Sequence, residues 1–226
     1  MRRFFSLLLG CVLWGALQLA QAQIDSSLCV RVVPFWGTPL CLPAIEGKVE
    51  CYQQPAVKDL ADLYEFAGNS VQAFYLNEAT YAQADSIAWL VFDDYLKLYT
   101  TNSLSNQRFG SKAFDEIARE LGGYFERGDW KDIKELLTLP NDSFSLEKPL
   151  LLDAYQPMED VRSFNILLQE TQRGSTQFVV FNLSVLRIKE RLIWLAYYRH
   201  YANVDTPAEA RAYSDLLVAS FMEVNR

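Results

Sequence analysis

Residues 177–201, QFVVFNLSVLRIKERLIWLAYYRHY, decide the fold of this chain. Two apolar runs flank the charged pair Lys189-Glu190, and their β-branched and aromatic content predicts two strands, 177–188 and 191–201, joined by a two-residue turn. Such a turn places on one face Phe178, Val180, Leu186, Ile193, Leu195 and Tyr197, and on the other Val179, Phe181, Leu183, Val185, Leu192, Trp194, Ala196 and Tyr198. A hairpin that is apolar on both faces must be covered on both.

Two further strands and a helix complete the C-terminal part. Strands are predicted over 150–155 and 161–169, with a turn at Arg173-Gly174, so this region forms an antiparallel meander. The tetrad Thr206-Pro207-Ala208-Glu209 has the pattern of a capping box with proline in the first turn, and it predicts a helix ending near Val224. The expected fold class is therefore α+β: an antiparallel sheet, built on the meander and the long hairpin 177–201, covered on both faces by helices.

The remaining mature chain has a mixed pattern. Residues 23–56 are expected to be extended, because four prolines punctuate them and exclude helix. Apolar spacing predicts a short strand over 71–76. It also predicts helices over 57–67, 79–101, 111–125 (with Ser111 as N-cap) and 129–137.

The order of elements over residues 148–224 supports a family resemblance. An antiparallel meander, the basic turn 187–191, a tyrosine-rich strand and a capped C-terminal helix together resemble the PsbP/Mog1/DcrB-like group of small sandwich domains. The helices expected between 79 and 137 depart from that group's pattern. The resemblance implies a binding or assembly accessory, often without catalytic residues, and no functional residue is carried over from it.

The N-terminus has the three parts of a secretory signal peptide. Arg2 and Arg3 precede an apolar run from Phe4 to Leu19, and Ala20-Gln21-Ala22 forms an A-x-A cleavage site. We therefore expect a signal peptide at 1–22 and a single globular α+β domain at 23–226, exported to the periplasm or secreted. A membrane anchor and a lipoprotein, the latter suggested by Leu8-Leu9-Gly10-Cys11, remain alternatives. No later apolar run reaches the length of a membrane span.

The charge of the mature chain excludes two classes of partner. Cleavage after Ala22 leaves 19 basic residues against 28 acidic ones, a net charge of −9. Nucleic acids and anionic membranes both require clustered lysine and arginine, so neither is expected as a partner. A protein or small molecule of the cell envelope is the expected partner. For a eukaryotic secreted protein, Asn141 and Asn182 would begin glycosylation sequons.

Three cysteines, Cys29, Cys41 and Cys51, remain after cleavage. An oxidising compartment favours one disulfide and leaves one thiol, which could join a partner chain. Cys41 and Cys51 flank a candidate hairpin turn and could face each other, while pairing of Cys29 with either of them stays open. No metal site is expected, because the only histidine, His200, is distant in sequence and no C-x-x-C pair exists.

One polar break interrupts the apolar hairpin. Asn182 and Ser184 lie on the predicted face that also holds Tyr197 and Arg199. Buried polar groups need partners, so one interpretation is a local hydrogen-bond network. The other is a ligand or partner pocket lined by these four residues and Tyr201, since tyrosine and arginine are favoured at binding sites.

No motif in the sequence identifies a particular enzymatic reaction. G-x-S-x-G, glycine-rich phosphate loops and HExxH are absent from the sequence, no cofactor is indicated, and His200 is the only histidine base. Asp93 and Asp94, adjacent on the predicted helix, would point about 100° apart. The leading hypothesis is a non-catalytic binding or assembly domain, which an exposed apolar patch would favour. The alternatives are a secreted hydrolase with scattered carboxylates and a structural, oligomeric envelope component.

Overall fold

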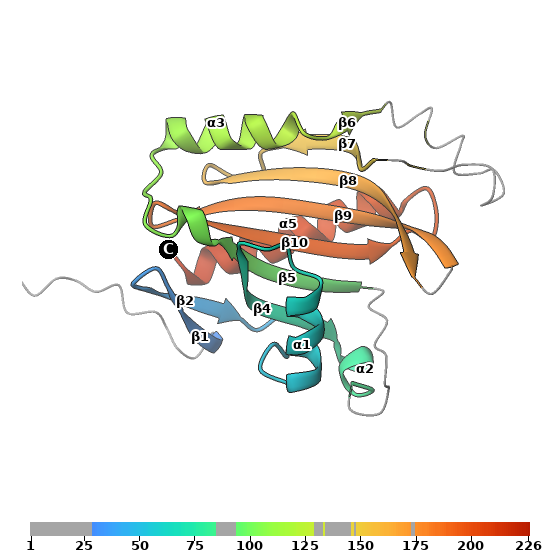
Figure 1. Ribbon diagram of the computed structural model, residues 1–226, viewed down its shortest axis with the longest axis horizontal. Helices are drawn as coiled ribbons and strands as arrows, with labels where there is room; N and C mark the ends of the chain where they lie inside the picture. The colour runs from blue at the N-terminus through green and yellow to red at the C-terminus, as the bar shows by residue number, and fades with distance from the viewer. Residues whose placement is uncertain (1–28, 85–93, 129–132, 134–145, 147, 173–174) are drawn as a thin grey trace, which may run out of the picture.

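The computed structural model describes residues 29–84, 94–128, 133, 146, 148–172 and 175–226 (Figure 1). Several predictions lie outside these ranges: the signal peptide at 1–22, Asp93, Asn141, the turn at Arg173-Gly174, and all of the helix 129–137 except residue 133.

An eight-stranded sheet forms the centre of the described chain, in the order β3-β4-β5-β10-β9-β8-β7-β6. Its strands in that order are Lys48–Glu50, Asn69–Asn77, Asp94–Thr101, Arg191–His200, Ser175–Ile188, Val161–Gln172, Leu150–Tyr155 and Glu126–Arg127. The first seven pair antiparallel, and β6 pairs parallel with β7. A separate ribbon consists of β1 (Cys29–Phe35) and β2 (Thr38–Pro43).

The helices of the described residues are α1, α2, α3 and α5. They span Pro55–Leu63, Glu78–Tyr81, Ser111–Gly122 and Thr206–Val224, and a 3₁₀ turn covers Asn102–Leu104. These elements confirm the α+β class with an antiparallel sheet. Within the described ranges, no helix combines the length and apolar character needed to cross a membrane.

The hairpin β9–β10 has the predicted register. Lys189 and Glu190 both have positive φ, 49° and 62°, as a two-residue turn with the hand of the sheet twist requires. Leu186 therefore pairs with Ile193, and Asn182 pairs with Tyr197. The two sets of apolar side chains consequently face opposite ways.

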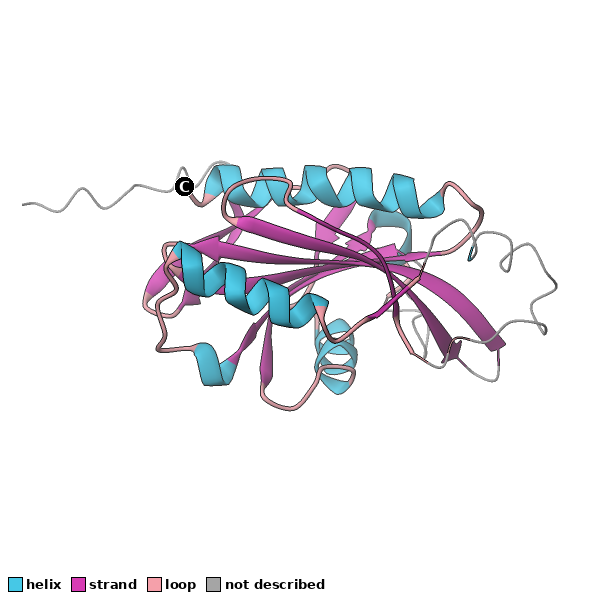
Figure 2. Ribbon diagram, turned by 90° about the horizontal axis from the view of Figure 1, so that it is seen from above, coloured by secondary structure: helices cyan, strands magenta, loops and turns pink. Residues whose placement is uncertain are grey.

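Each face of the hairpin contributes to its own core cluster. Helix α5 lies over one face (Figure 2), and its cluster contains Val180, Leu186, Ile193, Leu195, Tyr197, Ala210, Leu217, Val218, Phe221 and Met222. The other cluster joins α3 to the opposite face through Phe114, Ala118, Phe164, Leu183, Val185, Leu192, Trp194 and Ala196. Coverage of both whole faces by helices stays a prediction, because most of residues 129–147 lie outside the described part of the chain.

The predicted helix over 79–101 is wrong in its second half. Residues 94–101 form β5, which pairs with both β4 and β10. Leu96 and Leu98 are both fully buried, as the period of a strand requires, and Tyr95 and Thr100 favour a sheet. The apolar positions of residues 94–101 fit the helical period and the strand period alike. The hydrogen-bonded strands on both sides of the segment make it a strand.

The predicted helix starts also need correction. Asp205 is the N-cap of α5, and the Thr206 hydroxyl accepts hydrogen bonds from the N–H groups of Ala202 and Asn203. The Glu209 carboxylate accepts from Arg199, so neither side chain closes a capping box. Gly110, not Ser111, is the N-cap of α3.

Candidate binding surfaces

The first three predicted site residues lie beneath α5. Asn182, Ser184 and Tyr197 are all fully buried. The Ser184 Oγ lies 2.7 Å from Ser163 Oγ, and the Tyr197 ring contacts Tyr213 of α5 with centroids 5.2 Å apart. A glycan at Asn182 is therefore incompatible with the folded chain.

The other two predicted residues follow at the end of β10. Arg199 Nη2 donates to Glu209 Oε2 at 2.8 Å, and Tyr201, partly buried, donates its backbone N–H to Phe178 O at 2.9 Å. Neither of the two cavities described below is lined by any of the five residues. Their role in binding stays a prediction.

Lys48 is a buried lysine beside Tyr197, and no sequence pattern marked it as a candidate site residue. Lys48 Nζ donates to Asp94 Oδ1 and Asn77 Oδ1, both at 2.7 Å, and lies 5.7 Å from the ring centroids of Tyr197 and Tyr213. Burial lowers the pKa of Lys48, and Asp94 opposes that shift. Burial and the Asp94 carboxylate raise the pKa of Tyr197. The cluster holds the Lys48 ammonium between one carboxylate and two aromatic rings, and these contacts offset part of the cost of burying the charge.

One cavity, of about 340 Å³, lies between α3 and the β7–β8 connection. Its lining residues are Asp115, Ala118, Arg119, Ala154, Tyr155, Gln156, Arg162, Ser163 and Phe164. An ion pair joins Asp115 to Arg162, whose guanidinium also lies 5.1 Å from the Phe114 ring centroid. The carboxylate of this cavity is thus already neutralised.

A second cavity, of about 330 Å³, lies beside α1 and the start of β4. It is lined by Tyr52, Asp62, Glu65, Phe66, Ala67, Asn69, Ser70 and Val71. Asp62 accepts a hydrogen bond from Tyr52 and pairs with Lys58, and Glu65 pairs with Lys97 at 2.6 Å. Both carboxylates of this cavity are therefore held by cations.

Three large apolar side chains are exposed beside this second cavity. Leu63, Tyr64 and Phe66 are 71%, 74% and 81% exposed, and they are called the 63–66 patch. Helix α1 ends at Leu63, and Gly68, with φ of 95°, turns the chain into β4. The 63–66 patch therefore spans the last residue of α1 and the connection to β4.

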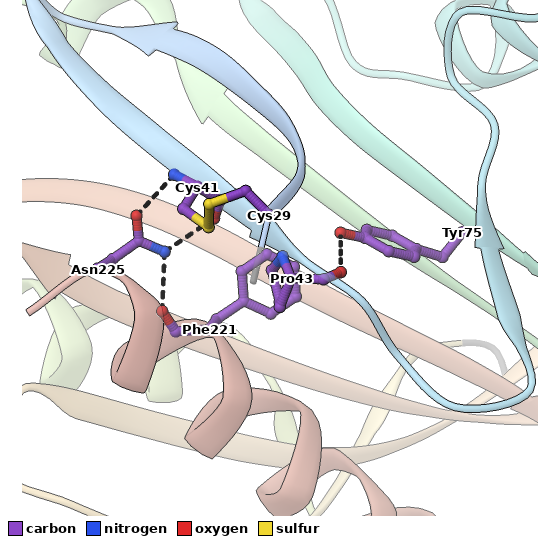
Figure 3. The surroundings of a disulfide bond; sticks show 6 residues. All are labelled: Cys29, Cys41, Pro43, Tyr75, Phe221 and Asn225. Carbon is purple, nitrogen blue, oxygen red and sulfur yellow. Dashed lines mark hydrogen bonds between the residues drawn. A yellow bond between two sulfur atoms is a disulfide. The ribbon is translucent and has the colours of Figure 1, made fainter. Parts of the chain in front are cut away.

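One disulfide forms, as predicted, and its partners are Cys29 and Cys41. Figure 3 shows the Asn225 amide against the backbone of Cys41, beside this bond. Asn225 Oδ1 accepts from the Cys41 N–H at 2.8 Å, and Asn225 Nδ2 donates to Cys41 O at 2.9 Å. The end of α5 is thereby fixed to the β1–β2 ribbon. The pairing of β1 with β2, which spacing alone could not supply, places Cys29 opposite Pro43 and brings the Cα atoms of Cys29 and Cys41 to 5.4 Å.

Cys51 is the free thiol among the described cysteines, and it is buried. Its Sγ donates to Phe74 O at 3.3 Å, and burial raises the pKa of the thiol to about 12. The thiolate is the reactive species, so we expect the folded protein to resist iodoacetamide at mildly alkaline pH and to take up one label after denaturation. Mass spectrometry of the intact protein measures both states. Rapid labelling of the native protein would revive the hypothesis that the odd cysteine joins a partner chain.

The candidate catalytic residues of the sequence are dispersed. His200 is exposed at the end of β10, and Asp94 is held by Lys48. Among the described residues, no group of three or more histidine, cysteine, aspartate or glutamate side chains is arranged to hold a metal ion.

No protein-family model and no curated protein matches the sequence. Among solved structures, the chain is similar to the Ran-binding protein Mog1p of Saccharomyces cerevisiae, with 11% identity and a TM-score of 0.33. The alignment covers 86% of this chain and 91% of that chain. The likeness is to a Mog1 protein, as the order of elements over residues 148–224 suggested. At this identity and TM-score the likeness is weak and carries no argument about partner or activity.

Proposed function

We propose that this chain is an exported, non-catalytic domain that binds another protein of the cell envelope through the 63–66 patch. The observation that carries the proposal is the exposure of Leu63, Tyr64 and Phe66 within four consecutive residues. Exposed apolar side chains that are gathered in one place mark interaction sites, whereas scattered ones do not. Tyrosine and phenylalanine are also enriched in the cores of protein interfaces.

The charge around the patch favours a basic partner. Asp59, exposed on α1, stands one turn before Leu63, and the mature chain expected from cleavage after Ala22 has 19 basic against 28 acidic residues. We therefore expect a partner surface with an apolar pocket and a rim of lysine or arginine. Complementary charge of this kind raises the association rate and excludes wrong partners.

The alternatives receive less support. A hydrolase would need two carboxylates free to exchange protons, whereas Asp62, Glu65 and Asp115, at the two cavities, are all in ion pairs. A coat component linked through its odd cysteine would need an accessible thiol, and Cys51 is buried. The proposed domain keeps the predicted architecture, with helices covering both faces of the sheet.

A paired capture experiment tests the binding surface. The mature protein, expressed in its own compartment, is compared with the double variant Leu63→Ser/Phe66→Ser and with Leu216→Ser, a control that alters another exposed leucine, 65% exposed on α5. We expect a partner whose recovery falls roughly tenfold or more with the double variant and is unchanged with the control, because aromatic anchors dominate interface energies. Circular dichroism verifies that each variant is folded. Equal recovery by all three proteins, or no captured protein, would refute the proposal.

The proposal that the protein is exported has a separate test. The protein recovered from the producing cell is expected to begin at Gln23, since Ala20-Gln21-Ala22 forms the cleavage site. Mass spectrometry of the intact chain measures that end directly. A chain that retains Met1, or a lipid on Cys11, would contradict cleavage after Ala22.

A further inference from the structure

The cavity of about 340 Å³ beside α3 contains a cation that no described residue neutralises. The charged residues of its lining are Asp115, Arg119 and Arg162, two positive charges against one negative. Arg162 pairs with Asp115 and also donates to the backbone oxygen of Val161, so both side chains are engaged. Arg119 is exposed, and its guanidinium makes no hydrogen bond or ion pair within the described part of the chain. The cavity therefore offers a free guanidinium to a carboxylate from outside.

The strand that lines this cavity has an open edge. β6 pairs with β7 only at Leu150 and Leu151 (Figure 1), so among the described strands none lies beside the rest of β7 on the side away from β8. Neighbouring residues of an antiparallel strand direct their backbone N–H and C=O groups to opposite edges. One of Ala154 and Tyr155, which both line the cavity, therefore directs both groups away from β8. These groups are available to an added strand.

Helix α3 forms the opposite wall of the cavity. Asp115, Ala118 and Arg119 are three and four residues apart, so their side chains share one face of the helix. Phe164 of β8 is buried and supplies an apolar part of the lining. An exposed sheet edge with side-chain contacts beside it is where proteins add an extended peptide as a further strand. Backbone hydrogen bonds then give affinity, and the neighbouring side chains give specificity.

We propose that this cavity binds an extended peptide segment that carries a carboxylate. The segment adds to the edge of β7 as a short strand, bonded to the outward-facing backbone groups of Ala154 or Tyr155. Its carboxylate, from an acidic side chain or a chain end, accepts hydrogen bonds from Arg119. This inference is independent of the 63–66 patch, which adjoins β4, because four strands lie between β4 and β7.

Titration with synthetic peptides, followed by nuclear magnetic resonance of the full mature protein, tests the site. The probe is the acetylated and amidated hexapeptide Val-Thr-Val-Thr-Val-Glu. We expect the backbone amide signals of residues 154–156 and the Nε–H signal of Arg119 to shift together. The peptide with glutamine in place of glutamate should bind roughly fivefold more weakly, because it lacks the charge. A third peptide, with alanine at the end and a free carboxyl terminus, tests a chain end as the source of the carboxylate.

The outcomes separate a bound strand from a bound anion. Arg119→Gln should lower the affinity for the glutamate peptide roughly fivefold, and Arg108→Gln, which alters an exposed arginine outside the cavity, should not. A peptide with methylated backbone nitrogens should give no shift. Absence of shifts at residues 154–156 with either carboxylate peptide at millimolar concentration, or the same shifts with acetate alone, would overturn the proposal.

The double variant Leu63→Ser/Phe66→Ser keeps this test distinct from that of the proposed function. It should leave the peptide titration unchanged, because neither residue lines the cavity beside α3. Loss of peptide binding in this variant, with the protein still folded by circular dichroism, would contradict the placement of the peptide on β7.

Discussion

Substitution of Phe221 by alanine is expected to lower the free energy of unfolding by about 3–5 kcal/mol, the usual cost of removing a buried phenylalanine. Phe221 is fully buried on α5 and meets the ring of Tyr75 of β4 edge to face, with centroids 6.0 Å apart. The same core cluster contains Leu40 and Leu42 of β2. Phe221 is therefore the side chain through which α5, the large sheet and the β1–β2 ribbon share one core.

The measurement is urea unfolding of the mature protein, followed by circular dichroism. The control is Leu216→Ala on the same helix, which removes an exposed side chain and should cost less than about 0.5 kcal/mol. A loss for Phe221→Ala no larger than for Leu216→Ala would mean that α5 is not held by this cluster. A fall in the slope against urea would instead indicate that the helix had detached from the folded state.

The C-terminal hairpin could be predicted because several signals agree there. The two runs are longer than most strands, aromatic and β-branched residues fill them, and only one short charged pair interrupts them. A two-residue turn fixes the register, and the register fixes which face each side chain occupies. Local preference and long-range pairing therefore predict the same structure.

In residues 94–101, the local sequence pattern alone does not predict the structure that long-range pairing produces. Their apolar positions satisfy helical and strand periods alike, and the choice depends on β4 and β10, which pair with both edges of the segment. Lys97 adds to the ambiguity, because a lysine suggests a solvated face while its buried ammonium pairs with Glu65. A period computed along the chain contains no information about partners that lie far away in sequence.

The candidate sites were harder to predict than the fold for the same reason. The sequence indicated Asn182 and Ser184 as a polar break on the face that holds Tyr197, but not that α5 covers these residues. The 63–66 patch lies within the helix predicted over 57–67, and the sequence did not indicate that its three side chains are exposed. Exposure and convergence of side chains are products of the tertiary structure.

Removal of the Cys29–Cys41 disulfide is the other change with a large expected effect. The bond closes a short loop, with a sequence separation of 12, and a crosslink of that size is expected to contribute about 3 kcal/mol by restricting the unfolded chain. For a domain of this length the melting temperature of Cys29→Ala/Cys41→Ala should fall by roughly 6–12 °C. Reduction of the unsubstituted protein should give the same loss, and a smaller effect in both experiments would contradict the assignment of the bond as structural.

The disulfide and Asn225 should also act together. Asn225 holds both backbone polar groups of Cys41, and its Nδ2 also donates to Phe221 O at 2.8 Å. Without the disulfide, β1 is no longer covalently linked to Cys41. We then expect β2, the strand that Asn225 binds through Cys41, to be less well ordered. Asn225→Ala should therefore cost about 1–3 kcal/mol in the oxidised protein and clearly less in the variant without the disulfide. A double-mutant cycle of urea unfolding measures this difference, and strict additivity would show that the ribbon keeps its place on α5 without the bond.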